Sequence, residues 1–262
     1  MNRLFLTRDA IHFGDLILVN GQHPYREKHR PEPAPVPEPG SPILLDRRAA
    51  DPLSHLMAAI HGWDQIAPVS GWRSHQEQQA IWDQSLVEHG QDFTQTYVAR
   101  PGCSEHETGL AIDLGLRSDH LDFIRPAFPY DGVCQTFRDL APRYGFLQRY
   151  PAGKESLTGI GHEPWHFRYV GQPHASLMAE LDLTLEEYLD FLRAYPYGER
   201  AYETKDNGVD TWVSYLAASS TGTTILDLPE GLVCTLSGNN IDGYIVTTQR
   251  TDHVRNTHLR RP

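Results

Sequence analysis

The sequence predicts an α+β fold in which a mostly antiparallel central sheet is flanked by helices and followed by a small β-rich C-terminal addition. Three features of its 262 residues support this prediction. Short apolar runs such as LAIDLGL and WHFRYVG are typical of buried strands, while longer segments repeat apolar residues at helical spacing. Residues 210–250 contain several β-prone runs. At 39% hydrophobic residues, the chain can bury a core.

The first part of the chain is predicted to contain a strand, a loop and a helix. LILVN at residues 16–20 indicates a strand that ends in an Asn-Gly turn. The proline-rich segment 31–42 is expected to be a surface loop that packs no core. Residues 48–62 form a helix that stops at Gly62. Its apolar positions have helical spacing: Leu53, Leu56, Met57 and Ile60.

Strands and helices are predicted to alternate in the middle of the chain. APVSGWRS indicates a short strand and a turn, and the helix SHQEQQAIWDQSLVEHG follows. That helix begins at Ser74, because Ser74-x-x-Glu77 has the pattern of a capping box. Residues 110–116 are predicted to form a buried strand and WHFRYVG another strand. Residues 134–145 indicate a helix that is interrupted or ended near Pro142. LTLEEYLDFLRAY is an amphipathic helix capped by Thr184.

The character of the chain changes after Tyr195. The runs TWVSYLAA, TTILDL and LVCTLSGNNIDGYIVTTQR are β-prone, and the last has the form of a hairpin around Gly238-Asn239-Asn240. No cluster of metal-ligand residue types occurs in this region. We therefore predict a domain at residues 1–195 that carries the chemistry and a small β-rich appendage at residues 196–262.

Charge and cysteine content restrict the class of protein. A formal net charge of −11 argues against a nucleic-acid binder, which needs a basic face. Three cysteines are an odd number and too few for a disulfide framework, so a reducing compartment suits them. The N-terminal apolar run is interrupted by charged residues, unlike a signal peptide, and no apolar run reaches the roughly 18 residues of a membrane span. We expect a soluble, cytoplasmic protein.

The segment GHEPWHF contains a formal H-E-x-x-H match from His162 to His166. That zinc-protease pattern works only on a helix, where both histidines share one face. Pro164 stands inside it, and a proline in a helix costs about 3 kcal/mol or more. We therefore expect an extended segment, in which Pro164 and His166 point one way and Glu163 and Trp165 the other. His162 is not expected to be a ligand.

A second segment, SEHETGLAIDLG, supplies the missing ligand types. His106 and Asp113 lie seven residues apart, which does not fit one helix face but fits a loop histidine followed by a strand aspartate. Gly109 between them permits a tight turn. With His166 they form a His₂Asp set, a nitrogen and oxygen mixture that zinc accepts while keeping one position open.

Two further residues have types that hydrolysis requires. Glu163, three residues before His166, can act as a general base that takes a proton from water and passes it to a leaving amine. The planar guanidinium of Arg73 can bind a carboxylate or a developing oxyanion. These residue types together point to metal-assisted hydrolysis of an anionic substrate.

Three motifs resemble one family of enzymes. They are S-x-H-x-x-G-x-A-x-D at Ser104–Asp113, E-P-W-H at Glu163–His166, and S-G-[YW]-R-S-x-x-x-Q at Ser70–Gln78. They are similar to those of the VanY/VanX/VanXY zinc D,D-peptidases, and most similar to the bifunctional VanXY dipeptidase/carboxypeptidases. The resemblance covers roughly residues 15–195. It implies hydrolysis of the D-Ala-D-Ala dipeptide and/or the C-terminal D-Ala of peptidoglycan precursors, which removes the vancomycin target.

The resemblance also implies a role for each matching residue. His106, Asp113 and His166 would bind Zn²⁺, Glu163 would be the catalytic base, and Arg73 would stabilise the charge that develops at the scissile carbonyl. Residues 1–195 would then form the catalytic domain.

Three more residues are implied to contact substrate. Ser104 and Gln78 would help to hold it, and Trp165 would line the pocket. The family usually has a tyrosine before the motif arginine, whereas this chain has Trp72, so no hydroxyl role transfers to that position.

Two other functions compete with this one. A peptidoglycan L,D- or D,D-endopeptidase of wall recycling or lysis would use the same chemistry, but we expect it to carry an export signal or a wall-binding repeat. A non-catalytic zinc-binding module, as in hedgehog-type signalling domains, would not need Glu163 and Arg73, and both are present.

Overall fold

The computed structural model describes residues 2–26, 31–36, 38 and 40–250, and it consists of two compact units. One unit is Val19–Glu186, and the other combines Met1–Leu18 with Glu187–Pro262. Both units contain antiparallel sheets and the larger one also contains most of the helices, which confirms the α+β class. The first eighteen residues thus belong with the C-terminal strands, although our predicted division lay between residues 195 and 196.

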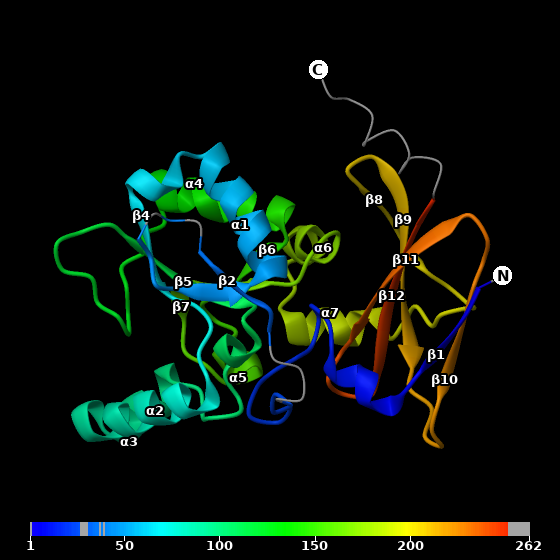
Figure 1. The fold of residues 1–262 in the computed structure, drawn as a ribbon, viewed down its shortest axis with the longest axis horizontal. Helices are drawn as coiled ribbons and strands as arrows, with labels where there is room; N and C mark the ends of the chain where they lie inside the picture. The colour runs from blue at the N-terminus through cyan, green and yellow to red at the C-terminus, as the bar shows by residue number, and fades with distance from the viewer. Residues whose placement is uncertain (1, 27–30, 37, 39, 251–262) are drawn as a thin grey trace. The chain divides into compact units, whose positions relative to one another are not determined.

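The larger unit is built on a four-stranded antiparallel sheet with the strand order β4-β5-β7-β6 (Figure 1). These strands are β4 Ile66–Ser70, β5 Ala111–Leu116, β7 Glu163–Tyr169 and β6 Phe146–Tyr150. The first three were predicted and β6 was not. A separate pair joins β2 Pro33–Pro35 to β3 Leu44–Asp46.

Helices lie on both sides of this sheet, with α1 and α4 on one side and α2 and α3 on the other (Figure 1). The helices are α1 Arg47–Ala59, α2 His75–His89, α3 Gln91–Tyr97, α4 Gly132–Leu140, α5 Glu155–Thr158, α6 His174–Leu181 and α7 Leu185–Leu192. Short 3-10 turns occur at Arg8–His12, Gly62–Asp64, Glu105–Thr108 and Ala141–Tyr144. The predicted helices, including the Ser74–Glu77 capping box, are confirmed.

The main core lies between the sheet and the α1/α4 side. Ile112 and Leu114 of β5 pack there with side chains of α1, α4 and the neighbouring strands. Asp113, between them, points to the opposite face because successive side chains of a strand alternate. Burial of each large apolar side chain contributes roughly 1.5–3 kcal/mol to the stability of the fold. A shift of β5 by one residue would lose this burial and place the carboxylate of Asp113 in the core. The core therefore fixes the direction in which Asp113 points.

Two predictions about the first forty residues were wrong. Residues 16–20 are largely buried but form no strand, because Leu16 N–H donates to the Ser237 hydroxyl and Leu18 N–H to the Asn239 carbonyl instead of to a strand ladder. The proline-rich segment also contributes to the core: Val36 is buried in it, directly after β2. Prolines are tolerated in β2 because it is an edge strand with one partner.

The smaller unit contains a four-stranded antiparallel sheet of order β11-β12-β9-β8 and a separate β1-β10 pair. The strands are β1 Asn2–Leu6, β8 Tyr202–Asp206, β9 Val209–Ala217, β10 Thr224–Leu228, β11 Leu232–Gly238 and β12 Gly243–Arg250. β11 and β12 form the predicted hairpin around Gly238-Asn239-Asn240. Leu226, Leu228 and Val246 form the centre of this unit's own small core.

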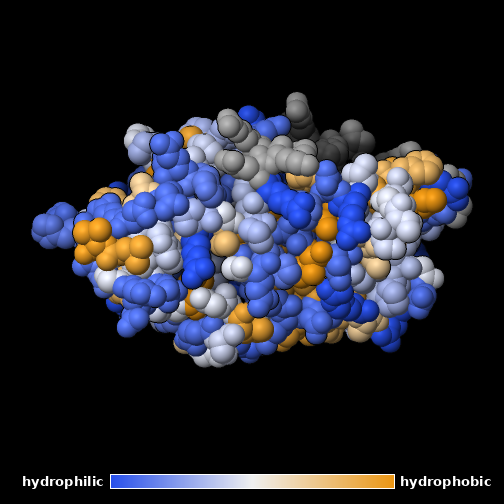
Figure 2. All heavy atoms as spheres, turned by 90° about the horizontal axis from the view of Figure 1, so that it is seen from below, coloured by the Kyte–Doolittle hydropathy of each residue, from blue (hydrophilic) through white to orange (hydrophobic). Residues whose placement is uncertain are grey.

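On the face shown in Figure 2, hydrophobic side chains form small separate groups among hydrophilic ones. Within the described residues, no helix combines the length and the apolar character needed to cross a bilayer.

Candidate metal centre and active site

A cavity of about 380 Å³ opens on the α2 side of the larger unit's sheet. Its volume lies in the range of small-molecule sites. All eight residues that the sequence singled out line it: Arg73, Gln78, Ser104, His106, Asp113, Glu163, Trp165 and His166. These residues come from the three motifs Ser70–Gln78, Ser104–Asp113 and Glu163–His166, which the fold brings together.

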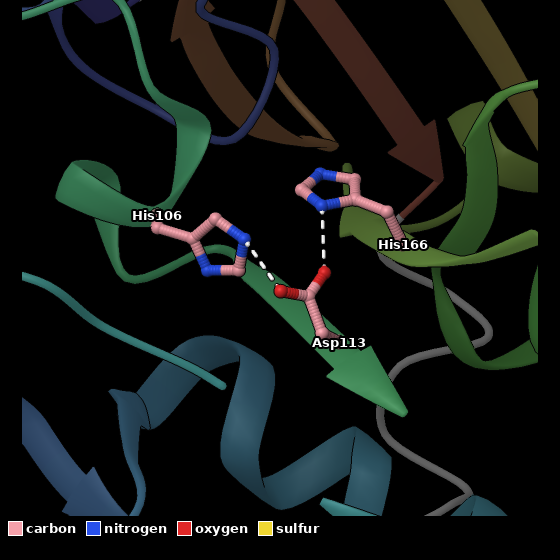
Figure 3. Close-up of side chains that lie close together, drawn as sticks. All are labelled: His106, Asp113 and His166. Atoms are coloured by element: carbon pink, nitrogen blue, oxygen red, sulfur yellow. Dashed lines mark hydrogen bonds and ion pairs between the residues drawn. The ribbon is translucent and has the colours of Figure 1, made fainter. Parts of the chain in front are cut away.

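Three of these residues form a compact group of possible metal ligands (Figure 3). One nitrogen or oxygen atom from each of His106, Asp113 and His166 lies within 4.8 Å of the others, and all three residues are buried. Asp113 is central: its Oδ2 is 3.2 Å from His106 Nε2 and its Oδ1 is 2.9 Å from His166 Nδ1. Two imidazoles and a carboxylate at this spacing fit a zinc ion with an open coordination position.

Local backbone features aim the two histidines at Asp113. His106 lies on the 3-10 turn Glu105–Thr108, which ends at Gly109 with a left-handed φ of 73°. A Cβ at Gly109 would lie 2.9 Å from Asp46 N, so the tight turn into β5 requires glycine. His106 Nδ1 lies 2.7 Å from the Gly71 carbonyl, to which it donates, and this leaves Nε2 for a metal. His166 stands directly opposite Asp113 in the β5–β7 ladder.

A bulge in β7 brings Glu163 into the same cavity as His166. We expected the two side chains to point to opposite faces, and this was wrong, because both line the cavity. Gln148 of β6 pairs with Phe167 and Tyr150 pairs with Glu163, so two residues along β6 correspond to four along β7. The pairing is irregular between these two points, so the regular alternation of side chains does not hold along this part of β7. Glu163 Oε2 consequently lies 3.8 Å from His166 Nδ1.

The environment of Glu163 suits proton transfer near neutral pH. Its carboxyl group is buried, and this burial, together with the negative charge of Asp113, raises the pKa of Glu163 to about 8 against the opposing effects of His166 and Arg73. A general base is most effective when its pKa lies near the working pH.

Arg73 is held at the rim of the metal group by three hydrogen bonds. Its Nε donates to the Ser70 hydroxyl at 2.8 Å, and its two terminal nitrogens donate to Gln78 Oε1 at 3.2 Å and to Asp113 Oδ2 at 3.1 Å. Its backbone N–H donates to the His106 carbonyl at 3.2 Å. The guanidinium is therefore held in a fixed position beside the metal-ligand group.

Comparison with known proteins assigns the family. The sequence model of VanY, D-alanyl-D-alanine carboxypeptidase, matches residues 42–172, which include all the cavity residues named above. The chain belongs to the VanY family. It is 41% identical over 180 residues to the bifunctional D-Ala-D-Ala dipeptidase and carboxypeptidase VanXYC of Enterococcus gallinarum, covering 68% of this chain and 94% of that relative.

Solved structures extend the similarity beyond the VanY-family segment. The crystal structure of the vancomycin resistance D,D-dipeptidase VanXYg in complex with a D-Ala-D-Ala phosphinate analogue superposes with a TM-score of 0.92 at 46% identity. It covers 95% of this chain and 99% of that one. A VanY D,D-pentapeptidase from a VanB-type resistance cassette, solved as a mutant with Zn(II), has a TM-score of 0.55 at 30% identity and covers 67% of this chain and 98% of that one.

In this VanY-family protein, the three residues predicted to contact substrate, Gln78, Ser104 and Trp165, have different surroundings. The side-chain oxygen of Gln78 accepts a hydrogen bond from Arg73, and its NH₂ group donates to the Ala99 carbonyl at 2.8 Å. In this structure Gln78 therefore orients Arg73. Ser104 is the residue before the 3-10 turn, but its side chain caps no backbone N–H there. Trp165 belongs both to the cavity wall and to the core. Their substrate contacts stay predictions.

His162 lies outside the metal group, as expected. Its Nε2 is 2.7 Å from the Tyr130 hydroxyl, and the two rings stack with centroids 6.0 Å apart.

Sequence reasoning missed two residues of this site, Glu105 and Tyr150. The Glu105 carboxylate is fully buried and contacts His166, and the ring of Tyr150 lies 4.9 Å from the ring of His166. Glu105 stands beside His106 in the motif, but so does Glu107, and nothing in the sequence separates the two. Tyr150 belongs to β6, the strand that was not predicted.

The charges of the group favour a cation at its centre. Burial opposes ionisation of Asp113, but the two neighbouring histidines hold the pKa of its carboxyl far below the usual value. Burial likewise lowers the pKa of His106, with a further contribution from Arg73. For His166 burial acts in the same direction, yet hydrogen bonds to Asp113 and Glu105 raise its pKa to about 9. In the metal-free protein His166 is therefore protonated at neutral pH.

We expect zinc affinity to rise with pH as a result. Zinc needs neutral imidazole, so below the pKa of about 9 it must displace a proton from His166. The affinity should then increase about tenfold per pH unit between about pH 6 and about pH 8, as measured by competition with a chelator of known pH dependence. His162→Ala should leave this slope unchanged. An affinity independent of pH in this range would show that His166 gives up no proton to the metal.

Proposed function

We propose that this chain is a zinc-dependent D,D-peptidase that hydrolyses the D-Ala-D-Ala dipeptide and/or removes the C-terminal D-Ala of peptidoglycan precursors. The observation that carries the proposal is the convergence of the His106/Asp113/His166 group, Glu163 and Arg73 in one cavity. The dipeptidase and carboxypeptidase activities of VanXYC, the D,D-dipeptidase activity of VanXYg and the Zn(II) in the VanY structure support it. A non-catalytic zinc module would have no need for a buried acid and a preorganised guanidinium beside the metal group.

The residues of the chain would divide the chemistry between them. A zinc ion held by His106, Asp113 and His166 would supply Lewis acidity, which activates water and polarises a carbonyl oxygen. Glu163 would accept the proton of the attacking water and return it to the leaving amine, so that one water is consumed and one C–N bond is broken. Arg73 would donate hydrogen bonds to the oxygen on which negative charge develops.

The other predicted residues would position the substrate. Ser104 lines the cavity with a hydroxyl that caps no helix, and can therefore donate to a substrate oxygen or accept from a substrate amide. Gln78 would keep Arg73 in place, and Trp165 would exclude water from one wall of the cavity. The division into a catalytic domain at residues 1–195 and an appendage at residues 196–262 stays a proposal; all eight site residues lie within the Val19–Glu186 unit.

In a cell, this activity would remove the D-Ala-D-Ala terminus that vancomycin binds, and so contribute to vancomycin resistance. The proposal rests on the resistance proteins among the relatives, VanXYg and the VanB-type VanY. It is tested by expressing the chain in a susceptible host that also makes D-Ala-D-lactate or D-Ala-D-Ser termini. An unchanged minimum inhibitory concentration would argue for ordinary wall metabolism instead.

The decisive enzymatic test compares Glu163→Ala with the unchanged protein. We expect the zinc-loaded protein to release D-Ala from D-Ala-D-Ala or from a pentapeptide that ends in D-Ala-D-Ala, measured by a coupled D-amino-acid oxidase assay. Glu163→Ala should abolish release while zinc stays bound, because Glu163 is no part of the three-residue metal group.

Glu155→Ala is a matched control, since Glu155 is an exposed acidic residue at the start of α5 and lies outside the cavity lining. It should keep full activity. Full activity of Glu163→Ala would contradict the proposed mechanism. Cleavage of cross-linked wall fragments, without release from dipeptide or pentapeptide, would indicate an endopeptidase.

We also propose a cytoplasmic location. Cys103, Cys134 and Cys234 are all free thiols in the structure, and free thiols are typical of reducing compartments. Fractionation of expressing cells should recover the chain with cytoplasmic markers, and recovery from the periplasm or the medium would contradict this assignment.

A further inference from the structure

Glu105 is the centre of a largely buried ionic network next to the metal group. Its Oε1 accepts hydrogen bonds from Arg149 Nε and from a terminal nitrogen of Arg168, both at 2.9 Å. The remaining nitrogens of Arg149 pair with the two carboxylate oxygens of Glu186 at 2.9 and 2.6 Å. The side chains of Glu105, Arg149 and Arg168 have no exposed surface. The network contains two carboxylates and two guanidiniums, so its charges balance.

The second oxygen of Glu105 faces a metal-ligand candidate. Because both arginines use Oε1, Oε2 is directed at His166 Nε2, 3.4 Å away. The other ring nitrogen, Nδ1, lies 2.9 Å from Asp113 Oδ1. The two nitrogens of His166 therefore face different partners: Nδ1 faces the group that would hold the metal, and Nε2 faces a carboxylate outside that group.

We propose that Glu105 is a positioning residue that keeps the proton of His166 on Nε2 and so presents the Nδ1 lone pair to the metal. This inference rests on the proposed function, because it assumes that His166 is a ligand. A metal-bound imidazole usually donates its other N–H to a carboxylate or carbonyl, which fixes both tautomer and ring orientation. His106 has such a partner in the Gly71 carbonyl, and Glu105 provides the equivalent for His166.

The arrangement of the arginines explains why Glu105 holds a fixed position. A buried carboxylate without partners would be strongly destabilised, and two guanidiniums bound to a single oxygen compensate its charge. They also prevent the carboxylate from rotating, because rotation would turn Oε1 away from both donors. The 3.4 Å contact exceeds the usual 2.7–3.2 Å for such bonds. We expect it to shorten when zinc replaces the Nδ1 proton, because metal binding makes the remaining N–H a stronger donor.

Glu107 provides a matched control within the same motif. It is also buried, but it accepts from the Gly102 N–H at 2.7 Å and lies 3.0 Å from His75 Nδ1. Within the described part of the chain, its carboxylate forms no hydrogen bond or ion pair with His106, Asp113 or His166. Replacing Glu107 by glutamine therefore removes the charge of a buried carboxylate two residues after Glu105 without changing the tautomer of His166.

The test compares Glu105→Gln and Glu107→Gln in the full-length protein. In Glu105→Gln the amide oxygen must stay with the arginines, which turns the NH₂ toward His166. An NH₂ group needs an acceptor, so Nε2 loses its proton and Nδ1 gains it, which blocks the metal. We expect zinc affinity, measured by chelator competition, to fall about 10- to 100-fold in Glu105→Gln. It should change less than about twofold in Glu107→Gln, and equal affinity in both variants would overturn the proposal.

A spectroscopic readout separates this role from a merely structural one. In histidine ¹H–¹⁵N correlation spectra of the unchanged zinc-loaded protein, His166 should carry its proton on Nε2 and show a metal-shifted Nδ1. A proton on Nδ1 of His166, or zinc bound through its Nε2, would overturn the proposal. Because this measurement uses the unchanged protein, the proposal can be tested even if the Glu105→Gln variant does not fold. Because neither measurement needs turnover, an enzyme inactive on D-Ala-D-Ala would refute the proposed function while leaving this inference to be decided separately.

Discussion

The site depends on one constraint, a carboxylate that is buried on the face of β5 opposite to the core. Ile112 and Leu114 fix that strand by packing into the core, and the alternation of side chains then leaves Asp113 no other direction. A buried carboxylate needs compensation, and the structure supplies it from three sides, through both histidines and Arg73. These three neighbours of Asp113 are also groups that the proposed metal and substrate would use, so the burial of this carboxylate and the assembly of the site are linked.

Irregular backbone supplies what regular strands cannot. The left-handed turn at Gly109 lets His106 approach from a loop, and the bulge in β7 turns Glu163 to the same cavity as His166. On the other side, the capped start of α2 follows Arg73 directly and buries Gln78 where its amide can hold the guanidinium. Each of these irregularities lies next to a residue of the proposed active site, whereas the regular parts of the sheet carry the core.

The metal ligands could be predicted from the sequence because their residue types and their local geometry agree. Pro164 excluded a helix, and β7 is indeed a strand. The direction of Glu163 could not be predicted, because a bulge depends on how β6 pairs with β7 and leaves no local signal. Glu105 and Glu107 look alike in the motif and differ only through distant partners, Arg149 and Arg168 for one and His75 for the other. The composition of LILVN is typical of a strand, but its backbone N–H groups donate to Ser237 and Asn239, which are distant in the sequence. The sequence of the segment alone could not predict this.

In the proposed active site, His106, Asp113 and His166 hold one zinc ion beside Glu163. A crystal structure of the zinc-loaded protein, with anomalous diffraction data collected above and below the zinc edge, tests it most directly. We predict a single strong peak about 2.0–2.1 Å from His106 Nε2 and His166 Nδ1 and about 2.0–2.2 Å from an Asp113 oxygen. We also predict an open position facing Glu163. A peak at another histidine, or coordination of His166 through Nε2, would contradict this arrangement.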